Sequence, residues 1–208
     1  MINTILVEDD LYIQKHFVDC LAADGEFHLV GVFRDAFEAE KHCNATVKLV
    51  LMDVQTQHKH SGLAAAERIK KAFPQIKIVV ATSLVDPEVL QRAKLGAADS
   101  LWYKDSTQKR LMDVVRQTMA GEHIFPDAPP TVEIGMAKST EFTKTELKVL
   151  RHLMRGLSYT RIAAEMGCEM STVKFHVANM LQKTGLENKL QLALAVSDVK
   201  LVADLAEE

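Results

Sequence analysis

The sequence predicts an α/β fold, a doubly wound parallel sheet of five strands, followed by a small all-α domain. Two observations support this prediction. In the first 120 residues, five short apolar runs alternate with helical patterns, whereas only helical periods remain after residue 140. Strict alternation of strand and helix favours a parallel sheet with helices on both faces, because each crossover packs back onto the sheet.

The composition is that of a soluble globular chain. Of its 208 residues, 48% are hydrophobic and 25% charged, so the chain can bury a core. The 25 Lys and Arg nearly balance the 28 Asp and Glu, which leaves a formal net charge of −3 and no overall basic field. No apolar run approaches the ~18 residues of a membrane helix, and the N-terminus lacks a signal-peptide pattern. We therefore expect a cytoplasmic protein with no membrane partner.

The apolar runs of the first 120 residues predict strands, and the periodic segments between them predict helices. Strands are expected at 2–7, 27–33, 47–52, 76–81 and 100–103. Helices are expected through about residue 23, at 36–43, 63–73 and 87–95, and from about 107 to 120. The run 47–52 is apolar at nearly every position, which suits a strand buried on both faces. The three cysteines have no metal-type spacing and are expected to be buried thiols.

The composition divides the chain into two domains and a linker. The expected boundaries are 1–121 for the α/β domain, 122–140 for a proline-containing linker and 141–208 for the helical domain. Thr143 and Glu146 have the spacing of a capping box. Ser158 caps a second helix, Gly167 lies at the turn, and a third helix is expected at about 171–183. Helix, short glycine turn and helix form the helix-turn-helix pattern.

Chemically distinctive residues follow the predicted strands of the α/β domain. Glu8 and Asp9 follow the first strand, Asp53 the third, Thr82 the fourth and Lys104 the fifth. The carboxyl ends of parallel strands meet at one edge, where such sheets bind ligands. Three carboxylates there repel one another and favour a cation such as Mg²⁺, and a carboxylate can act as a nucleophile towards phosphorus. Each residue alone also fits an ordinary role, such as a helix cap or a solvated loop residue.

Four motifs at these strand ends resemble the receiver domain of two-component response regulators, a flavodoxin- or CheY-like fold. They are ILVEDD at 5–10, VLMDV at 50–54, VVAT at 79–82 and LWYKD at 101–105. The resemblance covers residues 1 to about 120 and implies that a sensor histidine kinase phosphorylates Asp53. It also implies Mg²⁺ binding by Glu8, Asp9, Asp53 and the backbone of Gln55, and sensing of the phosphoryl group by Thr82 and Lys104.

The loop after Asp53 departs from the receiver pattern. Thr56-Gln57 replaces a usual Met-Pro pair, the loop glycine Gly62 comes one residue late, and Leu101 stands where an aromatic residue is usual. These departures keep an alternative open, in which the receiver works without phosphate and serves dimerisation or the sensing of a ligand or partner.

The same loop carries two imidazoles, His58 and His60, on either side of Lys59. Two histidines so spaced can bind transition metals. A solvated loop is the commoner outcome for such residues, and a role in partner choice is a third possibility.

The third helix of the second domain has an unusual outer face. At 100° per residue, a core face is expected for Val173, Val177, Met180 and Leu181. The candidate DNA-binding residues lie elsewhere on this helix and are Thr172, Lys174, Phe175, His176, Ala178, Asn179 and Gln182. In a major groove, Lys174 suits phosphate or guanine, Phe175 a thymine methyl, and Asn179 or Gln182 an adenine edge. An ordinary surface helix is the alternative.

The second domain resembles the LuxR-type helix-turn-helix domain through FTKTELKVL at 142–150, GLSYTRIAA at 156–164 and STVKFHV at 171–177. A receiver followed by this domain is similar to the NarL/FixJ class of response regulators, which are not enzymes. The resemblance implies that Lys174, Phe175 and Ala178 point into the groove of double-stranded DNA. It also implies a homodimer that forms through the apolar C-terminal helix, expected at 189–202.

The leading hypothesis is therefore a DNA-binding transcription regulator controlled by phosphorylation of Asp53. The phosphate-independent regulator is the runner-up. A third hypothesis, an enzyme that uses Asp53 catalytically, lacks the glycine-rich phosphate loop after the first strand, where Glu8-Asp9-Asp10 stands instead.

Overall fold

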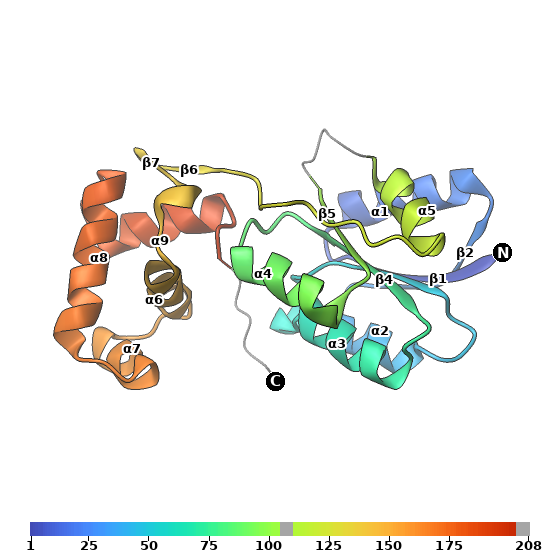
Figure 1. The fold of residues 1–208 in the computed structure, drawn as a ribbon, viewed down its shortest axis with the longest axis horizontal. Coiled ribbons are helices and arrows are strands. Elements are labelled where there is room, and N and C mark those ends of the chain that lie inside the picture. Colours follow the sequence, from blue (N-terminus) through green and yellow to red (C-terminus); the bar gives the residue numbers. More distant parts are fainter. Residues whose placement is uncertain (105–109, 203–208) are drawn as a thin grey trace. The chain divides into compact units, whose positions relative to one another are not determined.

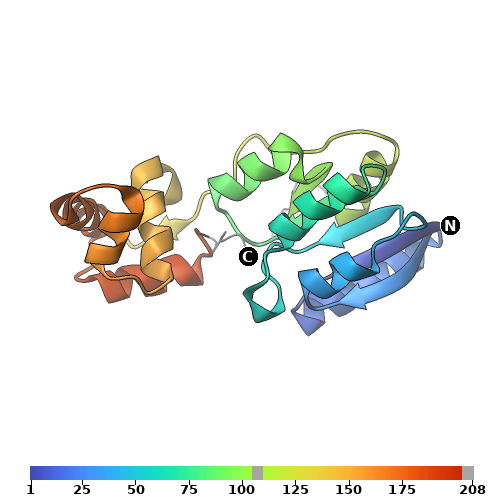
Figure 2. The ribbon, with the colours of Figure 1, turned by 90° about the horizontal axis from the view of Figure 1, so that it is seen from below.

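The chain folds into two units, which we describe one at a time. The structure is a computed structural model that describes residues 1–104 and 110–202. The first unit comprises Met1–Ser83 and Pro87–Ala128, and the second comprises Leu84–Asp86 and the described residues from Pro129 onward. Figures 1 and 2 show the elements of each unit from two sides.

The first unit is built on a five-stranded sheet in the order β2-β1-β3-β4-β5. The strands are β1 (Ile2–Val7), β2 (Phe27–Phe33), β3 (Leu49–Met52), β4 (Lys77–Thr82) and β5 (Ser100–Tyr103). All four pairings are parallel, which confirms the predicted doubly wound sheet. β3 begins two residues later than expected, although the N–H of Lys48 still donates to the carbonyl of Asn3 at 2.9 Å.

Helices cover both faces of this sheet, α1 and α5 on one and α2, α3 and α4 on the other (Figure 1). They are α1 (Leu11–Asp24), α2 (Ala36–His42), α3 (Gly62–Ala72), α4 (Pro87–Arg92) and α5 (Leu111–Met119), with short turns η1 (Gln57–Lys59) and η2 (Ala93–Ala97). The helix expected at 87–95 ends at Arg92. The chain continues as η2, a π-type turn wider than an α-helix, in which Gly96 has a φ of 119°. The start expected near 107 lies outside the described residues.

Apolar strand residues are buried on both faces of the sheet, as the continuous apolar runs predicted. On the α1–α5 face, Leu6, Leu51 and Val79 pack with Phe17 and Val115. On the other face, Val7, Val50, Met52, Ile78 and Val80 are at most 1% exposed. Because the strands are packed on both faces, their ends are held rigidly, and so are the positions of the residues that follow them.

The three cysteines are free thiols, but they are not all buried. Cys43 is buried, whereas Cys20 and Cys168 are partly exposed. The expectation of three buried thiols was therefore wrong for two of them, because Cys20 lines an open cavity beside α1 and Cys168 follows the turn at Gly167 that ends α7.

The second unit is helical. It contains α6 (Lys144–Met154), α7 (Tyr159–Met166), α8 (Met170–Thr184) and α9 (Lys189–Asp198), preceded by the strands β6 (Glu133–Ile134) and β7 (Ala137–Lys138) and the turn η3 (Ser139–Glu141). The capping box is confirmed, since the N–H of Glu146 donates to the Thr143 hydroxyl and the N–H of Thr143 donates to the Glu146 carboxylate. Across residues 1–104 and 110–202, no helix has the length and apolar character that crossing a bilayer requires.

The segment expected to be a linker contains an ordered hairpin. β6 and β7 pair antiparallel, and Ile134 and Ala137 are each 1% exposed in the core of the second unit. Gly135 makes the hairpin possible, because its φ is 58° and an added Cβ would overlap the carbonyl of Thr184. The N–H of Met136 donates to that same carbonyl at 2.9 Å. The domain boundaries at 121 and 140 stay predictions.

The last helix is shorter than expected. α9 ends at Asp198, four residues before the expected end at 202, because the chain turns at Lys200 with a φ of 53°. Leu201 and Val202 then fold into the core, at 1% and 8% exposure. The apolar sequence pattern therefore continues beyond the end of α9, because Leu201 and Val202 are also buried.

Candidate functional site

Four polar residues gather where the parallel strands end. Glu8 follows β1, Asp53 follows β3, Thr82 ends β4 and Lys104 follows β5. The backbone keeps them in line, since the N–H of Asp53 donates to the carbonyl of Val7 at 3.0 Å and that of Lys104 to the carbonyl of Thr82 at 2.9 Å. Glu8 and Thr82 are 0% exposed and Asp53 is 6% exposed. The edge is therefore a buried, polar pocket.

Lys104 joins two of the carboxylates. Its Nζ lies 2.8 Å from Oδ2 of Asp53 and 2.6 Å from Oε2 of Glu8, and all three side chains are at most 8% exposed. Oδ1 of Asp53 accepts a further hydrogen bond of 2.7 Å from the N–H of Val54. Both carboxylate oxygens of Asp53 are thus held in place, which fixes the direction in which this group faces.

Burial and mutual repulsion perturb the acids of the pocket. Burial, and then the nearby charge of Asp53, raise the pKa of Glu8 to about 7 against the attraction of Lys104. Burial also raises the pKa of Asp53, although Lys104 and the hydrogen bond from Val54 oppose it. Burial lowers the pKa of Lys104, but the two carboxylates outweigh this effect and raise it. The negative charge of the carboxylates in the pocket therefore exceeds the single positive charge of Lys104.

A third acid completes a possible metal site. One carboxylate oxygen each from Glu8, Asp9 and Asp53 lies within 4.8 Å of the others. Asp10 takes a different role, since its Oδ1 accepts hydrogen bonds from the N–H groups of Tyr12 and Ile13 and so caps α1. Three convergent carboxylate oxygens suit a small hard cation such as Mg²⁺.

The loop after Asp53 is pressed against it. The N–H of Gly62 donates to the carbonyl of Val54 at 2.9 Å, and an added Cβ at Gly62 would overlap the carbonyl oxygen of Asp53. Gln55 forms an isolated antiparallel bridge with Ser61. The loop is therefore closed at its base by residues on both sides, although it carries neither the usual proline nor the usual glycine position.

Two residues that support the acidic segment were missed in the sequence. The guanidinium of Arg34 donates to the carbonyl of Asp9 at 3.2 and 3.0 Å, and Nε2 of Gln14 donates to the carbonyl of Glu8 at 2.8 Å. Arg34 follows β2, so the same strand-end argument that selected Asp53 would have found it. Gln14 lies inside α1 and carries no such signal.

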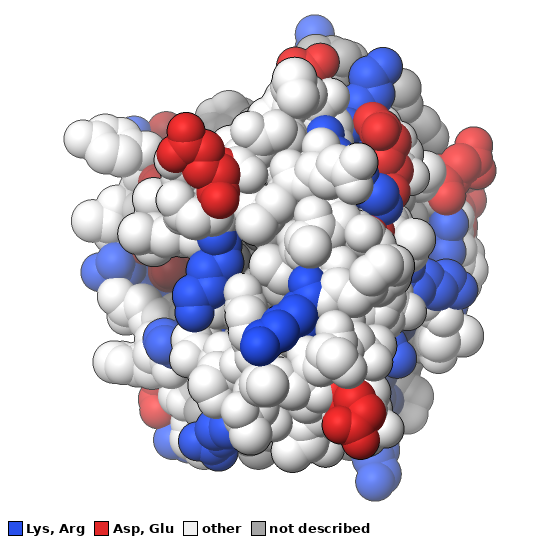
Figure 3. Space-filling model, turned by 90° about the vertical axis from the view of Figure 1, so that its left-hand side faces the viewer, with Lys and Arg blue, Asp and Glu red and all other residues white. Residues whose placement is uncertain are grey.

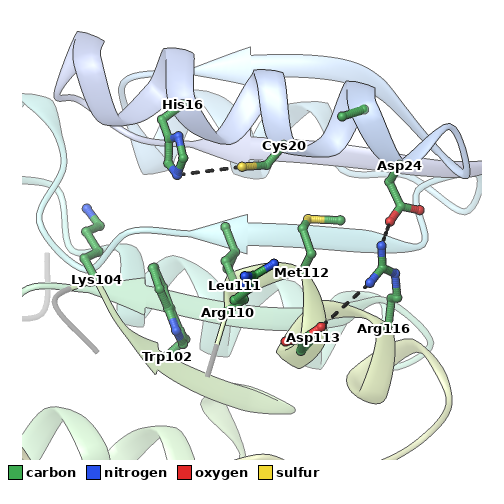
Figure 4. A pocket seen from close by; sticks show the side chains of 11 residues that line it. His16, Cys20, Asp24, Trp102, Lys104, Arg110, Leu111, Met112, Asp113 and Arg116 are labelled. Atoms are coloured by element: carbon green, nitrogen blue, oxygen red, sulfur yellow. Dashed lines mark hydrogen bonds and ion pairs between the residues drawn. The ribbon is translucent and has the colours of Figure 1, made fainter. Parts of the chain in front are cut away.

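A cavity of about 610 Å³ lies between α1 and α5 (Figure 4). Figure 4 shows His16 and Cys20 on one wall, 3.7 Å apart, with Trp102 and Lys104 across from them. Arg116 pairs with Asp24 on the far side. Lys104 is the residue that this cavity shares with the acidic pocket.

In the second unit, α8 has the two faces that its sequence predicted. Val173, Val177 and Met180 are at most 3% exposed, and Leu181 packs against the same core. On the outer side, Phe175 is 61% exposed, and its ring lies 5.7 Å from that of His176. Five candidates are exposed and two are partly buried. The exposed ones are Thr172, Lys174, Phe175, Ala178 and Gln182, and the partly buried ones are His176 and Asn179.

The charge of this region differs from that of the whole chain. Residues 141–190 contain 8 Lys and Arg against 5 Asp and Glu, so 8 − 5 = +3, compared with −3 for all 208 residues. Figure 3, which looks onto the side where α8 lies, shows Lys and Arg interspersed with broad uncharged areas and fewer acidic residues. A mildly basic, partly apolar surface is compatible with approach to a nucleic acid.

Comparison with protein families decides what these two units are. Residues 4–116 match the family described as "Response regulator receiver domain", and residues 140–196 match "Bacterial regulatory proteins, luxR family". The chain belongs to the response regulators. Its family consists of transcription regulators with a LuxR-type DNA-binding domain, not of enzymes.

Relatives and solved structures agree with this assignment over nearly the whole response regulator. It is 29% identical to the response regulator protein VraR of Staphylococcus aureus over 199 residues, which is 93% of this chain and 95% of VraR. It also resembles RcsB of Salmonella enterica serovar Typhimurium bound to promoter rprA with BeF3⁻, at a TM-score of 0.59 and 21% identity, over 96% of this chain and 100% of that one. It also resembles a structure of two RcsB dimers bound to two parallel DNAs, at a TM-score of 0.59 and 19% identity, over 95% of this chain and 98% of that one. At these identities the structures show the fold alone.

Receiver domains generally bind Mg²⁺ at an acidic pocket, and in this response regulator Glu8, Asp9 and Asp53 form an acidic cluster. The donor set fits the ion, because all three side chains offer carboxylate oxygens that converge at one point.

Proposed function

We propose that a sensor histidine kinase switches this response regulator by transferring a phosphoryl group to Asp53. The observation that carries the proposal is the buried contact of Asp53 with Lys104, at 2.8 Å, beside two further acids. A lone buried aspartate would be a poor acceptor of a dianionic group. An aspartate with an ammonium group in contact has a partner for the added charge.

The transfer is a nucleophilic substitution at phosphorus. An oxygen of the Asp53 carboxylate forms the new O–P bond, the P–N bond of the kinase phosphohistidine breaks, and the departing imidazole takes up a proton. Glu8, Asp9, Asp53 and the backbone of Gln55 would hold Mg²⁺, and the bound ion would supply positive charge to the phosphoryl oxygens. Lys104 supplies a second positive charge from the end of β5.

Thr82 and Lys104 are the proposed sensors of the phosphoryl group. Thr82 ends β4 and Lys104 follows the neighbouring strand β5, and the N–H of Lys104 donates to the carbonyl of Thr82. A new dianion at Asp53 attracts the ammonium group and offers an acceptor to the hydroxyl. Movement of these two side chains would bias the receiver between two conformations.

For the second unit, we propose that α8 lies in the major groove of double-stranded DNA. Support comes from its exposed phenylalanine flanked by Lys174, on a helix whose opposite face is fully packed. Lys174, Phe175 and Ala178 would face the groove, with Thr172, His176, Asn179 and Gln182 beside them. A homodimer would place two such helices about one helical turn of DNA apart.

The proposed dimer contact is narrower than the expected helix at 189–202. Leu192 and Val196 are 0% exposed and belong to the core, whereas Leu190 and Leu194 are 66% and 57% exposed. These two leucines lie one turn apart on α9 and form one apolar strip. The seam is therefore proposed for Leu190 and Leu194 rather than for the whole apolar segment.

Intact mass tests the phosphorylation. The full chain is incubated with acetyl phosphate and Mg²⁺, and the wild type is expected to gain the mass of one phosphoryl group. Asp53→Ala is expected to gain none, while Asp19→Ala, which removes an exposed acid on α1, gains one as the wild type does. Labelling of Asp53→Ala would contradict the assignment. A wild type that neither gains mass nor binds Mg²⁺ would favour the phosphate-independent regulator.

A further inference from the structure

Two histidines of the loop after Asp53 converge on one carboxylate from another loop. Nδ1 of His60 lies 2.9 Å from Oδ1 and 2.8 Å from Oδ2 of Asp35, and Nε2 of His58 lies 4.0 Å from the same Oδ2. Asp35 stands between β2 and α2, 25 residues before His60. The two imidazoles and the carboxylate therefore form a cluster apart from Glu8, Asp9 and Asp53.

The backbone of the loop brings both imidazoles to this carboxylate. His58 and Lys59 have φ values of 59° and 64°, the left-handed conformation that residues with a side chain rarely adopt. Thr56 stabilises this turn. Its hydroxyl donates to the carbonyl of His60 at 2.7 Å and accepts from the N–H of Ala36 at 3.1 Å. The strained turn is thus held against the segment that carries Asp35.

Asp35 itself is a fixed and ionised acceptor. Its side chain is 10% exposed, and Oδ1 caps α2 by accepting from the N–H groups of Phe37 and Glu38 at 2.8 and 3.2 Å. Oδ2 is the oxygen that both histidines approach. Burial acts to raise the pKa of Asp35, but the hydrogen bonds from His60 and the α2 backbone outweigh it and hold the pKa below its usual value.

We propose that Asp35, His58 and His60 bind one divalent transition metal ion of the zinc class. Two imidazole nitrogens and one carboxylate oxygen are donors that Zn²⁺ accepts, whereas Mg²⁺ prefers oxygen alone. In a tetrahedral zinc site, neighbouring donors are about 3.3 Å apart. The two measured donor distances to Oδ2, 2.8 and 4.0 Å, lie on either side of this value.

The remaining adjustment falls on His58. Its side chain is 73% exposed, compared with 29% for His60, and the two ring centres are 6.0 Å apart. Metal binding would require this exposed imidazole to rotate, because the donor atoms of Asp35, His58 and His60 do not all lie within 4.8 Å of one another in the structure. The open fourth position is left to water. A metal held there would clamp the segment 56–60 to the start of α2.

Zinc titration of the full chain, without an affinity tag, tests the proposal. A chelator of known affinity competes for Zn²⁺, and excess Mg²⁺ occupies the pocket at Asp53. The wild type is expected to bind one equivalent. His58→Ala and Asp35→Asn are each expected to weaken binding at least tenfold. Co²⁺ in place of Zn²⁺ gives visible absorption that reports nitrogen ligands directly.

Two matched variants separate metal binding from other effects. His60→Asn keeps a donor near the position of Nδ1, so it preserves the hydrogen bond to Asp35 and the melting temperature but loses the metal. His16→Ala removes the histidine next to Cys20, another metal-type pair of the first unit, and is expected to bind as the wild type does. Zinc affinity that falls with His16→Ala, or that stays unchanged in His58→Ala and His60→Asn, would overturn the proposal.

Hydrogen exchange supplies an independent readout. Zinc is expected to slow exchange of the amides in residues 56–60 in the wild type and to leave them unchanged in His60→Asn. Equal exchange with and without zinc in the wild type would mean that the metal does not sit on this loop. Neither measurement depends on phosphorylation of Asp53, so the proposal stands or fails separately from the proposed function.

Discussion

At the scale of single residues, Gly62 shows how closely the loop is fitted to Asp53, the proposed phosphoacceptor. A Cβ at this position would overlap the carbonyl oxygen of Asp53, and a backbone atom at a strand end cannot move aside. We therefore predict that Gly62→Ala destabilises the first unit by about 1–3 kcal/mol and slows phosphorylation. Urea unfolding and the rate of mass gain with acetyl phosphate measure the two effects.

Gly31→Ala is the matched control. Its added Cβ would meet the ring edge of Phe33 rather than backbone, and that half-buried ring can turn away. The loss of stability is expected to be smaller, and the labelling rate should not change. Equal losses for both variants would show that the carbonyl of Asp53 is not the constraint.

Asp99, buried before β5, makes stability depend on pH. It accepts hydrogen bonds from Lys70 at 2.9 Å, from Lys77 at 3.0 Å and from the N–H of Ile78 at 2.8 Å. Burial acts to raise the pKa of Asp99, but these donors outweigh it and lower the pKa below its usual value. The folded state therefore holds fewer protons than the unfolded state, so Asp99 stabilises the fold above the unfolded pKa of about 3.9.

We predict that Asp99→Asn costs about 1–3 kcal/mol near neutral pH. The difference from wild type should shrink as the pH falls below about 4 and through the lowered pKa of folded Asp99, because protonation then removes the charge that the lysines stabilise. Urea unfolding of both proteins across this range measures the difference. Asp19→Asn, whose ion pair with Lys15 is exposed, should show little effect, and a pH-independent gap for Asp99→Asn would refute the linkage.

At the scale of elements, α8 separates stability from DNA binding. Val173 and Lys174 are neighbours in sequence, but the first is buried and the second exposed. We predict that Lys174→Ala leaves stability unchanged and weakens binding to any duplex. The slope of log affinity against log salt should fall by about 0.9. Fluorescence anisotropy with a labelled duplex at several salt concentrations measures this slope.

Lys15→Ala is the control, because it removes the same charge from α1 of the first unit. It should leave the slope as in the wild type. A slope that falls equally in both variants would mean that overall charge, rather than α8, governs the contact with DNA.

Elements that carry an uninterrupted periodic pattern could be predicted from the sequence, and those that depend on tertiary contacts could not. The apolar runs located all five strands. The central strands are apolar at successive positions because they are buried on both faces, whereas β2 is apolar although every second residue from His28 to Val32 is exposed. The hairpin of β6 and β7 was missed, since strands of two residues show no alternation. The end of α9 was misplaced because Leu201 and Val202 are apolar residues that enter the core after the helix has ended, and their apolar character was taken as part of the helical pattern.

The candidate site divides in the same way. Parallel topology brings Glu8, Asp53 and Lys104 to one edge wherever the strands are correctly placed, so these residues could be predicted. The meeting of Asp35 with His60 could not, because it depends on a left-handed turn at His58 and Lys59. Histidine is enriched in left-handed turns but lysine is not, and such turns usually fall on Gly or Asn.

At the scale of the whole molecule, the chain places its proposed input and output in separate units. Asp53 and Lys104 belong to the first unit, and α8 and α9 to the second. Phosphorylation can affect DNA binding only if the two phosphorylation states differ in their affinity for DNA or for a second copy of the chain. Dimerisation can provide this difference in affinity, because the two α8 helices of a dimer would contact the same DNA together.

We predict that phosphorylation raises the duplex affinity of the full chain by about 5–150-fold, the usual range of such coupling, and shifts it from monomer to dimer. The double variant Leu190→Glu/Leu194→Glu should accept the phosphoryl group normally, because both leucines are exposed, yet sediment as a monomer and lose most of the gain in affinity. Leu11→Glu changes an exposed leucine of the first unit in the same way and controls for added charge. Analytical ultracentrifugation and anisotropy of phosphorylated protein measure the outcome. A phosphorylated double variant that still sediments as a dimer would move the contact away from α9 and leave the phosphorylation of Asp53 untouched.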